Sequence, residues 1–205
     1  MSKQARGHQT VERVLDVALE AVSMGGVHTL TISNLSAASG VSVGSLYHHF
    51  GARDGVLIAL YRRCLTSMLH AVCDAVLART SARDGITALV RAYIQWVQQS
   101  PQQASVIYAI GHSDLARERS SELDAISRRL TAPLFAWLQP HVQSGALMSL
   151  PSTLFETVAI GPAAETCRRI LAGAPGYSFA EAEALLPSLA WRALKARRLA
   201  ADARA

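Results

Sequence analysis

The 205-residue sequence has only three cysteines, and no two of them form a Cys-x-x-Cys pair. Cys64, Cys73 and Cys167 are odd in number and fall in segments with helical patterns. This arrangement excludes a disulfide-rich scaffold and a zinc ribbon. We expect three buried, reduced thiols, and a redox-sensing cysteine is the alternative.

Long hydrophobic runs are also missing, since no stretch of about 18 uncharged apolar residues occurs. The N-terminal stretch MSKQARGHQTVERV carries two early basic residues but continues into an amphipathic pattern, which does not fit a signal peptide. With 50% hydrophobic and 17% charged residues, the composition does not fit a disordered chain either. We therefore expect a cytoplasmic protein with no membrane partner.

The sequence lacks the common catalytic motifs: a glycine-rich phosphate loop, GxSxG and HExxH. Two short pairs of possible metal ligands are present, His70 with Cys73 and His112 with Asp114, and two ligands make a weak metal site. We expect no catalytic residue, no cofactor and no metal. A zinc enzyme built on one of these pairs is the alternative from another class.

The charge balance is compatible with a nucleic-acid partner without being specific for one. The net charge is +5 and the isoelectric point is near 9.5. Residues 1–63 hold six basic and four acidic side chains, against 14 and 11 in the remainder. The positive excess is therefore not concentrated at either end.

Helical periodicity organises the first fifty residues. From Thr10, apolar residues recur every three or four positions until Gly25, which predicts an amphipathic helix. Thr31 is a plausible N-cap and Gly40 a plausible C-terminal stop for a second helix of about two turns. Ser42 can cap a third helix that runs to about residue 49. Two short helices joined by a tight turn, behind a longer one, outline a helix-turn-helix.

The rest of the chain also reads as helices, because no alternating apolar pattern persists. A long helix begins near Arg53, and later helices are expected at about 83–100, 102–112, 115–144, 152–172 and 178–200. Kinks or short breaks are expected at Pro133, Pro140, Pro162 and Pro187. The predicted class is all-α with about nine helices.

Residues 39–50, SGVSVGSLYHHF, contain no lysine or arginine. Gly44 costs about 1 kcal/mol relative to alanine inside a helix, so its presence suggests that the backbone must approach something closely. Ser42 begins the third helix, and the exposed amides and positive dipole end of a helix start suit phosphate oxygens. Short side chains and a helix terminus can thus replace a basic patch.

Residues 14–57, VLDVALEAVSMGGVHTLTISNLSAASGVSVGSLYHHFGARDGVL, resemble the TetR family of transcriptional repressors. The resemblance is dense in this segment and extends to the remaining residues only in helical layout. It implies a DNA-binding helix-turn-helix domain at 1–53 and an effector-binding and dimerisation domain at 54–205. The implied function is a ligand-responsive homodimeric regulator, by family default a repressor, released from a palindromic double-stranded DNA operator by a small, largely apolar effector.

The resemblance carries DNA-binding roles onto matching positions. The DNA-binding candidates are Thr31, Ser42, Val43, Gly44, Ser45, Tyr47, His48 and Arg53. Val43 and Ser45 would enter the major groove, while Tyr47 and His48 would meet phosphates or base edges. Arg53 replaces the usual lysine of the family and keeps the positive charge. His49 stands where relatives often have tyrosine.

The second domain is expected to hold the effector and the dimer partner. The effector-pocket candidates, aromatic or polar residues among apolar stripes, are Met68, Tyr93, Trp96, Tyr108, His112 and Phe135. The dimer-interface candidates on the last two long helices are Leu154, Val158, Gly161, Leu186, Leu189 and Leu194. A second alternative is a helix-turn-helix protein that acts through protein partners and binds no DNA.

Overall fold

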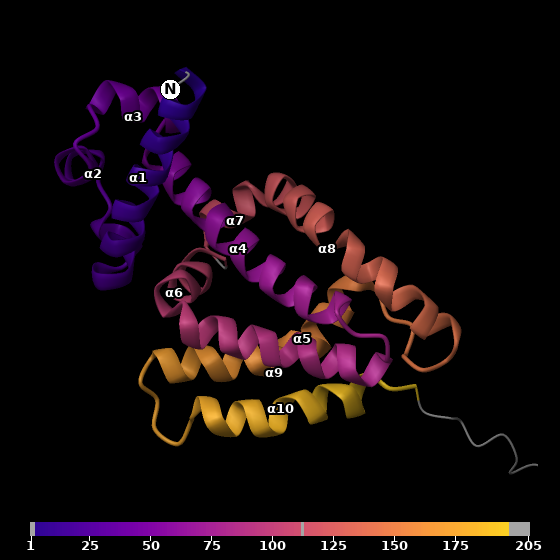
Figure 1. The fold of residues 1–205 in the computed structure, drawn as a ribbon. Coiled ribbons are helices and arrows are strands. Elements are labelled where there is room, and N and C mark those ends of the chain that lie inside the picture. Colours follow the sequence, from indigo (N-terminus) through magenta and orange to yellow (C-terminus); the bar gives the residue numbers. More distant parts are fainter. Residues whose placement is uncertain (1–2, 112, 197–205) are drawn as a thin grey trace, which may run out of the picture. The chain divides into compact units, whose positions relative to one another are not determined.

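The computed structural model describes residues 3–111 and 113–196. Within them it contains ten α-helices, one short 3-10 helix and no strand (Figure 1). The elements are α1 (Lys3–Gly25), η1 (Val27–Thr29), α2 (Ile32–Ser39), α3 (Val43–Phe50), α4 (Arg53–Leu77), α5 (Ala82–Gln99), α6 (Pro101–Ile110), α7 (Asp114–Glu118), α8 (Ser120–Gln143), α9 (Ser152–Leu171) and α10 (Phe179–Leu194). The all-α prediction is confirmed.

Two element boundaries differ from those expected from the sequence. The helix expected at 115–144 is two helices, because Arg119 leaves helical geometry at φ −103° and ψ 15° between α7 and α8. Helix α1 begins at Lys3 instead of near Thr10. The prediction placed the start too late because it depended on apolar periodicity, which the first turns of the helix lack. All four internal prolines lie inside assigned helices, so none of them ends an element.

The chain divides into two compact units: residues 1–67 with 100–127, here the first unit, and residues 68–99 with 128–205, the second unit. Helix α4 is continuous across this division. The predicted boundary at residue 53, between a DNA-binding domain and an effector-binding and dimerisation domain, is not defined by this division of contacts and stays a prediction.

In the first unit, α1 packs against η1, α2 and α6 around an aliphatic core. The largest fully buried side chains of this core include Leu30, Leu35, Leu46, Leu57 and Leu60. Leu46 comes from α3 and Leu60 from α4, so burial of these leucines fixes the third helix against the fourth. Each fully buried leucine contributes about 1.5–3 kcal/mol by leaving water.

Local hydrogen bonds fix the α2–α3 turn. Thr31 caps α2 by accepting from the Asn34 amide, and Ser42 caps α3 by accepting from the Ser45 amide. Gly40 ends α2 at φ +67°, a left-handed conformation that glycine adopts without a Cβ penalty. All three capping predictions are confirmed. The Ser36 hydroxyl also donates to the Val41 carbonyl at 2.8 Å, which ties α2 to the turn.

In the second unit, α10 packs against α5 and α9, and α5 packs against α9 (Figure 1). A glycine in α5 permits a close aromatic contact, because a Cβ at Gly85 would overlap the Trp137 ring. The Trp137 indole donates to the Arg79 carbonyl at 2.7 Å, so the ring is held in place. An isolated antiparallel bridge joins Leu147 to Lys195 after α10.

Candidate nucleic-acid interface

Helix α3 presents one exposed face and one buried face. Val43, Gly44, Tyr47 and His48 are exposed, with 45% of the Val43 surface and 52% of the Tyr47 surface open to solvent. Their spacing of one, three and four residues places them on one side of the helix. Leu46 is completely buried and Phe50 is half-buried, as expected from their inward spacing. The structure thus brings four of the eight DNA-binding candidates onto one continuous surface.

Large apolar side chains that stay exposed on a short, well-anchored helix indicate a binding surface, because they add nothing to the core.

Ser42 and Thr31 are also exposed and cap the starts of α3 and α2. Their helix starts leave backbone amides available to an anion. Ser45 is half-buried and its amide is occupied by the cap, so it is the least accessible of the α3 candidates.

Gly44 has no structural reason to be a glycine in the free protein. A Cβ built at this position meets no heavy atom within 4 Å. The residue lies inside α3, where glycine is less favourable than alanine by about 1 kcal/mol. No contact among the described residues therefore requires a glycine at this position.

We expect Gly44→Ala to raise the free energy of unfolding by about 0.5–1 kcal/mol, because alanine improves helix propensity without a clash. DNA binding should weaken at the same time, since the added methyl group would lie between the backbone and a closely approaching duplex. Chemical denaturation and a DNA titration measure the two effects. Improved stability with unchanged DNA affinity would show that no close approach occurs at Gly44.

Arg53 is tied into its own protein more closely than its predicted phosphate role requires. Its Nε donates to the Leu30 carbonyl at 2.7 Å and its Nη2 to the Val27 carbonyl at 2.6 Å. Its Nη1 donates to Asp54 at 3.2 Å. The bonds to Val27 and Leu30 attach the start of α4 to η1 and to the residue that follows it. Of the five guanidinium N–H groups, two are left for other acceptors.

Sequence reasoning missed Gly55, which allows α4 to begin directly after α3. A Cβ on Gly55 would overlap the carbonyl oxygen of Phe50, the last residue of α3. The available sequence signal was a glycine in the first turn of a helix, a position where glycine is unfavourable. Gly55 therefore permits the close approach of the first turn of α4 to the end of α3.

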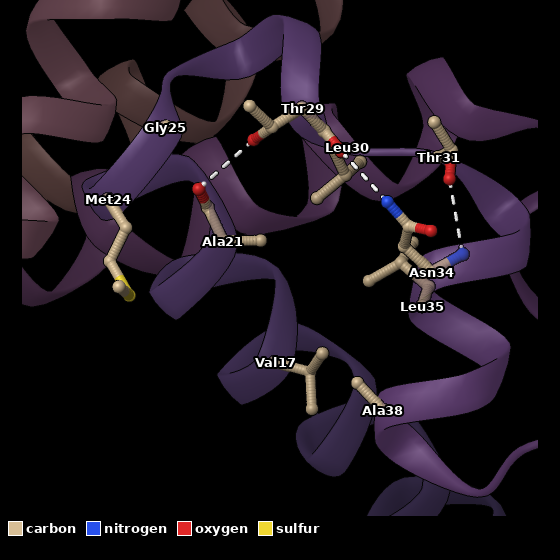
Figure 2. A pocket seen from close by; sticks show the side chains of 10 residues that line it. All are labelled: Val17, Ala21, Met24, Gly25, Thr29, Leu30, Thr31, Asn34, Leu35 and Ala38. Atoms are coloured by element: carbon tan, nitrogen blue, oxygen red, sulfur yellow. Dashed lines mark hydrogen bonds between the residues drawn. The ribbon is translucent and has the colours of Figure 1, made fainter.

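A mainly apolar cavity of about 320 Å³ lies beside the α2 N-cap (Figure 2). Val17 and Ala21 of α1 line it on one side and Leu35 of α2 on the other. The Thr29 hydroxyl donates to the Ala21 carbonyl at 3.1 Å across its upper edge. This bond holds the short η1 turn against α1 and so positions the start of α2.

Basic side chains near the helix-turn-helix differ in how far they are available to a DNA phosphate. Arg6 is exposed on α1, whereas the side chain of Lys3 lies outside the described residues. Arg63 serves the fold: it donates to Asp16 at 2.8 Å, to Glu12 at 3.2 Å and to the Leu15 carbonyl at 3.0 Å. Arg63 therefore joins α4 to α1 and is committed to that contact.

The effector-pocket candidates do not come together in one cavity. Tyr93 and Trp96 are buried in α5, and Met68 is half-buried in α4. Phe135 lines a cavity of about 170 Å³ in the second unit, whereas Tyr108 is in the first unit. The sixth candidate, His112, lies outside the described residues.

A larger cavity of about 420 Å³ lies within the first unit and escaped sequence reasoning. It is lined by Tyr61 and Leu65 of α4 and by Asp124 of α8, and none of the five described effector candidates borders it. Burial and the neighbouring Asp124 carboxylate both raise the pKa of the Tyr61 hydroxyl, which stays protonated at neutral pH. The cavity contains hydrogen-bonding groups, and the apolar pattern of the sequence does not predict where such groups come together.

The dimer-interface candidates are divided between surface and core. Leu154 and Leu189 are about half exposed, at 47% and 50%, and Leu186 and Val158 are half-buried. Leu194 has only 1% of its surface exposed within a single chain, so it has no area to give to a partner. Its carbonyl accepts from the Met148 amide at 2.9 Å, which turns the end of α10 against its own chain. Leu185, also in α10, is 60% exposed.

All three cysteines are buried free thiols, as expected. Burial raises the pKa of Cys64 to about 11 and that of Cys167 to about 11. Both are therefore thiols and not reactive thiolates at neutral pH. Among the described residues, no three histidine, cysteine or acidic side chains are grouped as metal ligands.

We expect native protein at pH 8 to react with iodoacetamide far more slowly than urea-unfolded protein, because Cys64 and Cys167 are both protonated and inaccessible. Mass spectrometry after timed alkylation measures the rate at each cysteine. Rapid labelling of Cys64 in the folded protein would contradict the buried-thiol assignment and favour a redox role.

The geometry defines a DNA-binding protein of the helix-turn-helix class: three packed helices whose third presents an exposed face from a capped start. The family model for bacterial regulatory proteins of the tetR family matches residues 14–60. The chain belongs to the TetR family of transcriptional regulators.

Helix α4 is also long and apolar enough to cross a membrane by length and composition, but it forms part of the buried core.

Comparisons beyond the helix-turn-helix extend over most of the chain. The HTH-type transcriptional regulator BetI of Rhizobium meliloti is 28% identical over 160 residues, which cover 77% of this chain and 75% of that protein. A TetR family regulator from Marinobacter aquaeolei superposes with a TM-score of 0.79 at 20% identity, covering 95% and 100% of the two chains. FadR of Bacillus subtilis, solved with stearoyl-CoA, has a TM-score of 0.71 at 18% identity over 87% and 96%. The two structures are similar to this chain in fold.

Proposed function

We propose that the protein is a ligand-responsive transcriptional regulator that binds a palindromic DNA operator as a homodimer and is released by a small effector. The observation that carries the proposal is the exposed face of α3, formed by Val43, Gly44, Tyr47 and His48 on a helix whose opposite side is buried. A helix of this kind fits the major groove, where short and apolar side chains contact base edges and thymine methyl groups. Membership of the TetR family supports the same conclusion. We place the protein in the cytoplasm, where its operator would be, and propose no catalytic activity.

The test is selection of bound fragments from the source genome, followed by titration of the best fragment at several salt concentrations. The binding constant should fall with rising salt, since phosphate contacts release counterions. A Tyr47→Ala variant should bind the fragment more weakly, with stability changed by less than about 0.5 kcal/mol because the side chain is exposed. If no fragment is retained at low salt, the alternative of a helix-turn-helix protein with protein partners gains support.

The effector response is supported by the similarity in fold to FadR, which was solved with stearoyl-CoA. An effector acts only through its different affinities for the DNA-competent and DNA-incompetent conformations. We propose that α4 couples the two sites, because it begins at Arg53 beside the helix-turn-helix and continues without interruption into the second unit. Crosslinking the second half of α4 to the effector core should abolish the response.

We propose that exposed leucines of α9 and α10 form the dimer contact. We expect Leu189→Asp to convert the dimer to a monomer. Leu189 is half exposed in the single chain, and burying an aspartate carboxylate there in an apolar interface would cost a large desolvation free energy. Analytical ultracentrifugation measures the change. Leu77→Asp, on a leucine 43% exposed at the end of α4, is the matched control and should remain dimeric. A dimer that survives Leu189→Asp would place the interface elsewhere.

A further inference from the structure

A third cavity in the first unit borders the end of α3 and has a different chemistry from the exposed face. Its volume is about 280 Å³, and its apolar floor includes Phe50 of α3 and Ile58 and Ala59 of α4. Three basic side chains, His49, Arg62 and Arg119, stand around this floor. An apolar floor with a few polar groups is the usual composition of a small-molecule site.

The charges around this cavity leave one cation without a partner. Arg62 makes no ion pair with any described residue, although its neighbour Arg63 is fully engaged with α1. Arg119 has only a long contact of 3.8 Å to Glu122, the one carboxylate in the lining. The cavity is therefore net positive, and Arg62, which is exposed to solvent, supplies a guanidinium fork that can bind an anion.

The cavity lies away from the proposed DNA-contacting face. At 3.6 residues per turn, His49 is about half a turn around α3 from the centre of the face formed by Val43, Gly44, Tyr47 and His48. An operator phosphate held by that face would lie on the other side of the helix. The free cation at Arg62 is therefore better matched to a separate small anion than to the duplex.

We propose that this cavity binds a small organic anion, a carboxylate on a compact apolar body, with Arg62 as the main charged partner. The volume corresponds to roughly nine water molecules at about 30 Å³ each, which limits the ligand to the size of a single substituted ring or a short branched acid. The Arg62 guanidinium would bind the carboxylate, His49 would add a hydrogen bond, and Phe50 and Ala59 would contact the apolar body. The site is distinct from any effector cavity beside Tyr61 or Phe135.

The test uses benzoate as the probe and the full chain without DNA, so its outcome does not depend on the proposed DNA binding. Titration followed by two-dimensional NMR should shift amide signals of His49, Phe50 and Ala59. Benzamide, which has the same shape without the charge, should bind at least about tenfold more weakly. Equal binding of benzoate and benzamide would overturn the proposal, as would benzoate shifts confined to other parts of the chain.

Two variants separate the charge from the cavity. Arg62→Gln should weaken benzoate binding about tenfold or more, while Arg13→Gln, an exposed arginine of α1 outside the lining, should bind as the parent does. Ala59→Leu keeps every charge but fills the floor, and it should also abolish binding. Circular dichroism establishes that each variant is folded. Benzoate binding unchanged in either Arg62→Gln or Ala59→Leu would refute the site.

Discussion

Gly55→Ala is expected to be the most damaging single-methyl change in the DNA-binding head, lowering the free energy of unfolding by about 3 kcal/mol or more. The added Cβ would occupy the position of the Phe50 carbonyl oxygen, and a backbone atom cannot rotate away as a side chain can. The start of α4 must shift from the end of α3, so the exposed face of α3 should lose its orientation as well. Urea denaturation measures the first effect and DNA titration the second.

Gly44→Ala is the matched control for this experiment, because it adds the same methyl group to an open position only eleven residues away. The two substitutions should change stability in opposite directions. A Gly55→Ala protein with a parental denaturation midpoint would mean that α3 and α4 do not approach each other as closely as the structure shows.

Arg53→Ala should lower the free energy of unfolding by about 2–3 kcal/mol, since it leaves the Leu30 and Val27 carbonyls without their charged donor. Operator affinity should fall as well, and the slope of affinity against salt should decrease by about one unit if the remaining N–H groups contact a phosphate. Arg53→Lys should recover the charge but only part of the stability, because lysine cannot reach two carbonyls with a planar fork.

Asp54→Ala provides the control for Arg53. The Arg53–Asp54 pair spans 3.2 Å between side chains that are 38% and 58% exposed, and such a pair contributes only about 0–1 kcal/mol. Asp54→Ala should therefore be nearly neutral in denaturation. If Arg53→Ala is equally neutral, the two carbonyl contacts do not stabilise the head, whereas a stability loss with an unchanged salt slope would remove Arg53 from the phosphate-binding set.

Features set by neighbouring residues were predictable from the sequence. The caps at Thr31 and Ser42 and the stop at Gly40 each depend on groups within five residues, and all three occur as predicted. The break at Arg119 was not predicted, because residues 117–122, RERSSE, contain no glycine or proline to mark it. The prolines in α8, α9 and α10 were expected to cause kinks or short breaks. The assigned helices continue through all of them, so no break occurs, and the kinks stay a prediction.

Features that depend on distant residues could not be predicted. Arg53 bonds to carbonyls 23 and 26 residues away, which no local pattern indicates. Leu194 continues the apolar stripe of α10, but the chain folds back on it through the contact with Met148 and removes it from the surface. The grouping of Arg62, Arg119 and His49 around one cavity likewise depends on two helices, α3 and α4, and on the junction between α7 and α8.

The separation of the two faces of α3 has an evolutionary consequence. Leu46 secures the helix from its buried side, whereas Val43, Tyr47 and His48 contribute little to the core. Exposed substitutions of this kind usually change stability by less than about 0.5 kcal/mol. Mutations at these three positions can therefore alter the preferred operator while the head remains folded, so a duplicated gene could acquire new regulatory targets without first acquiring compensating stability.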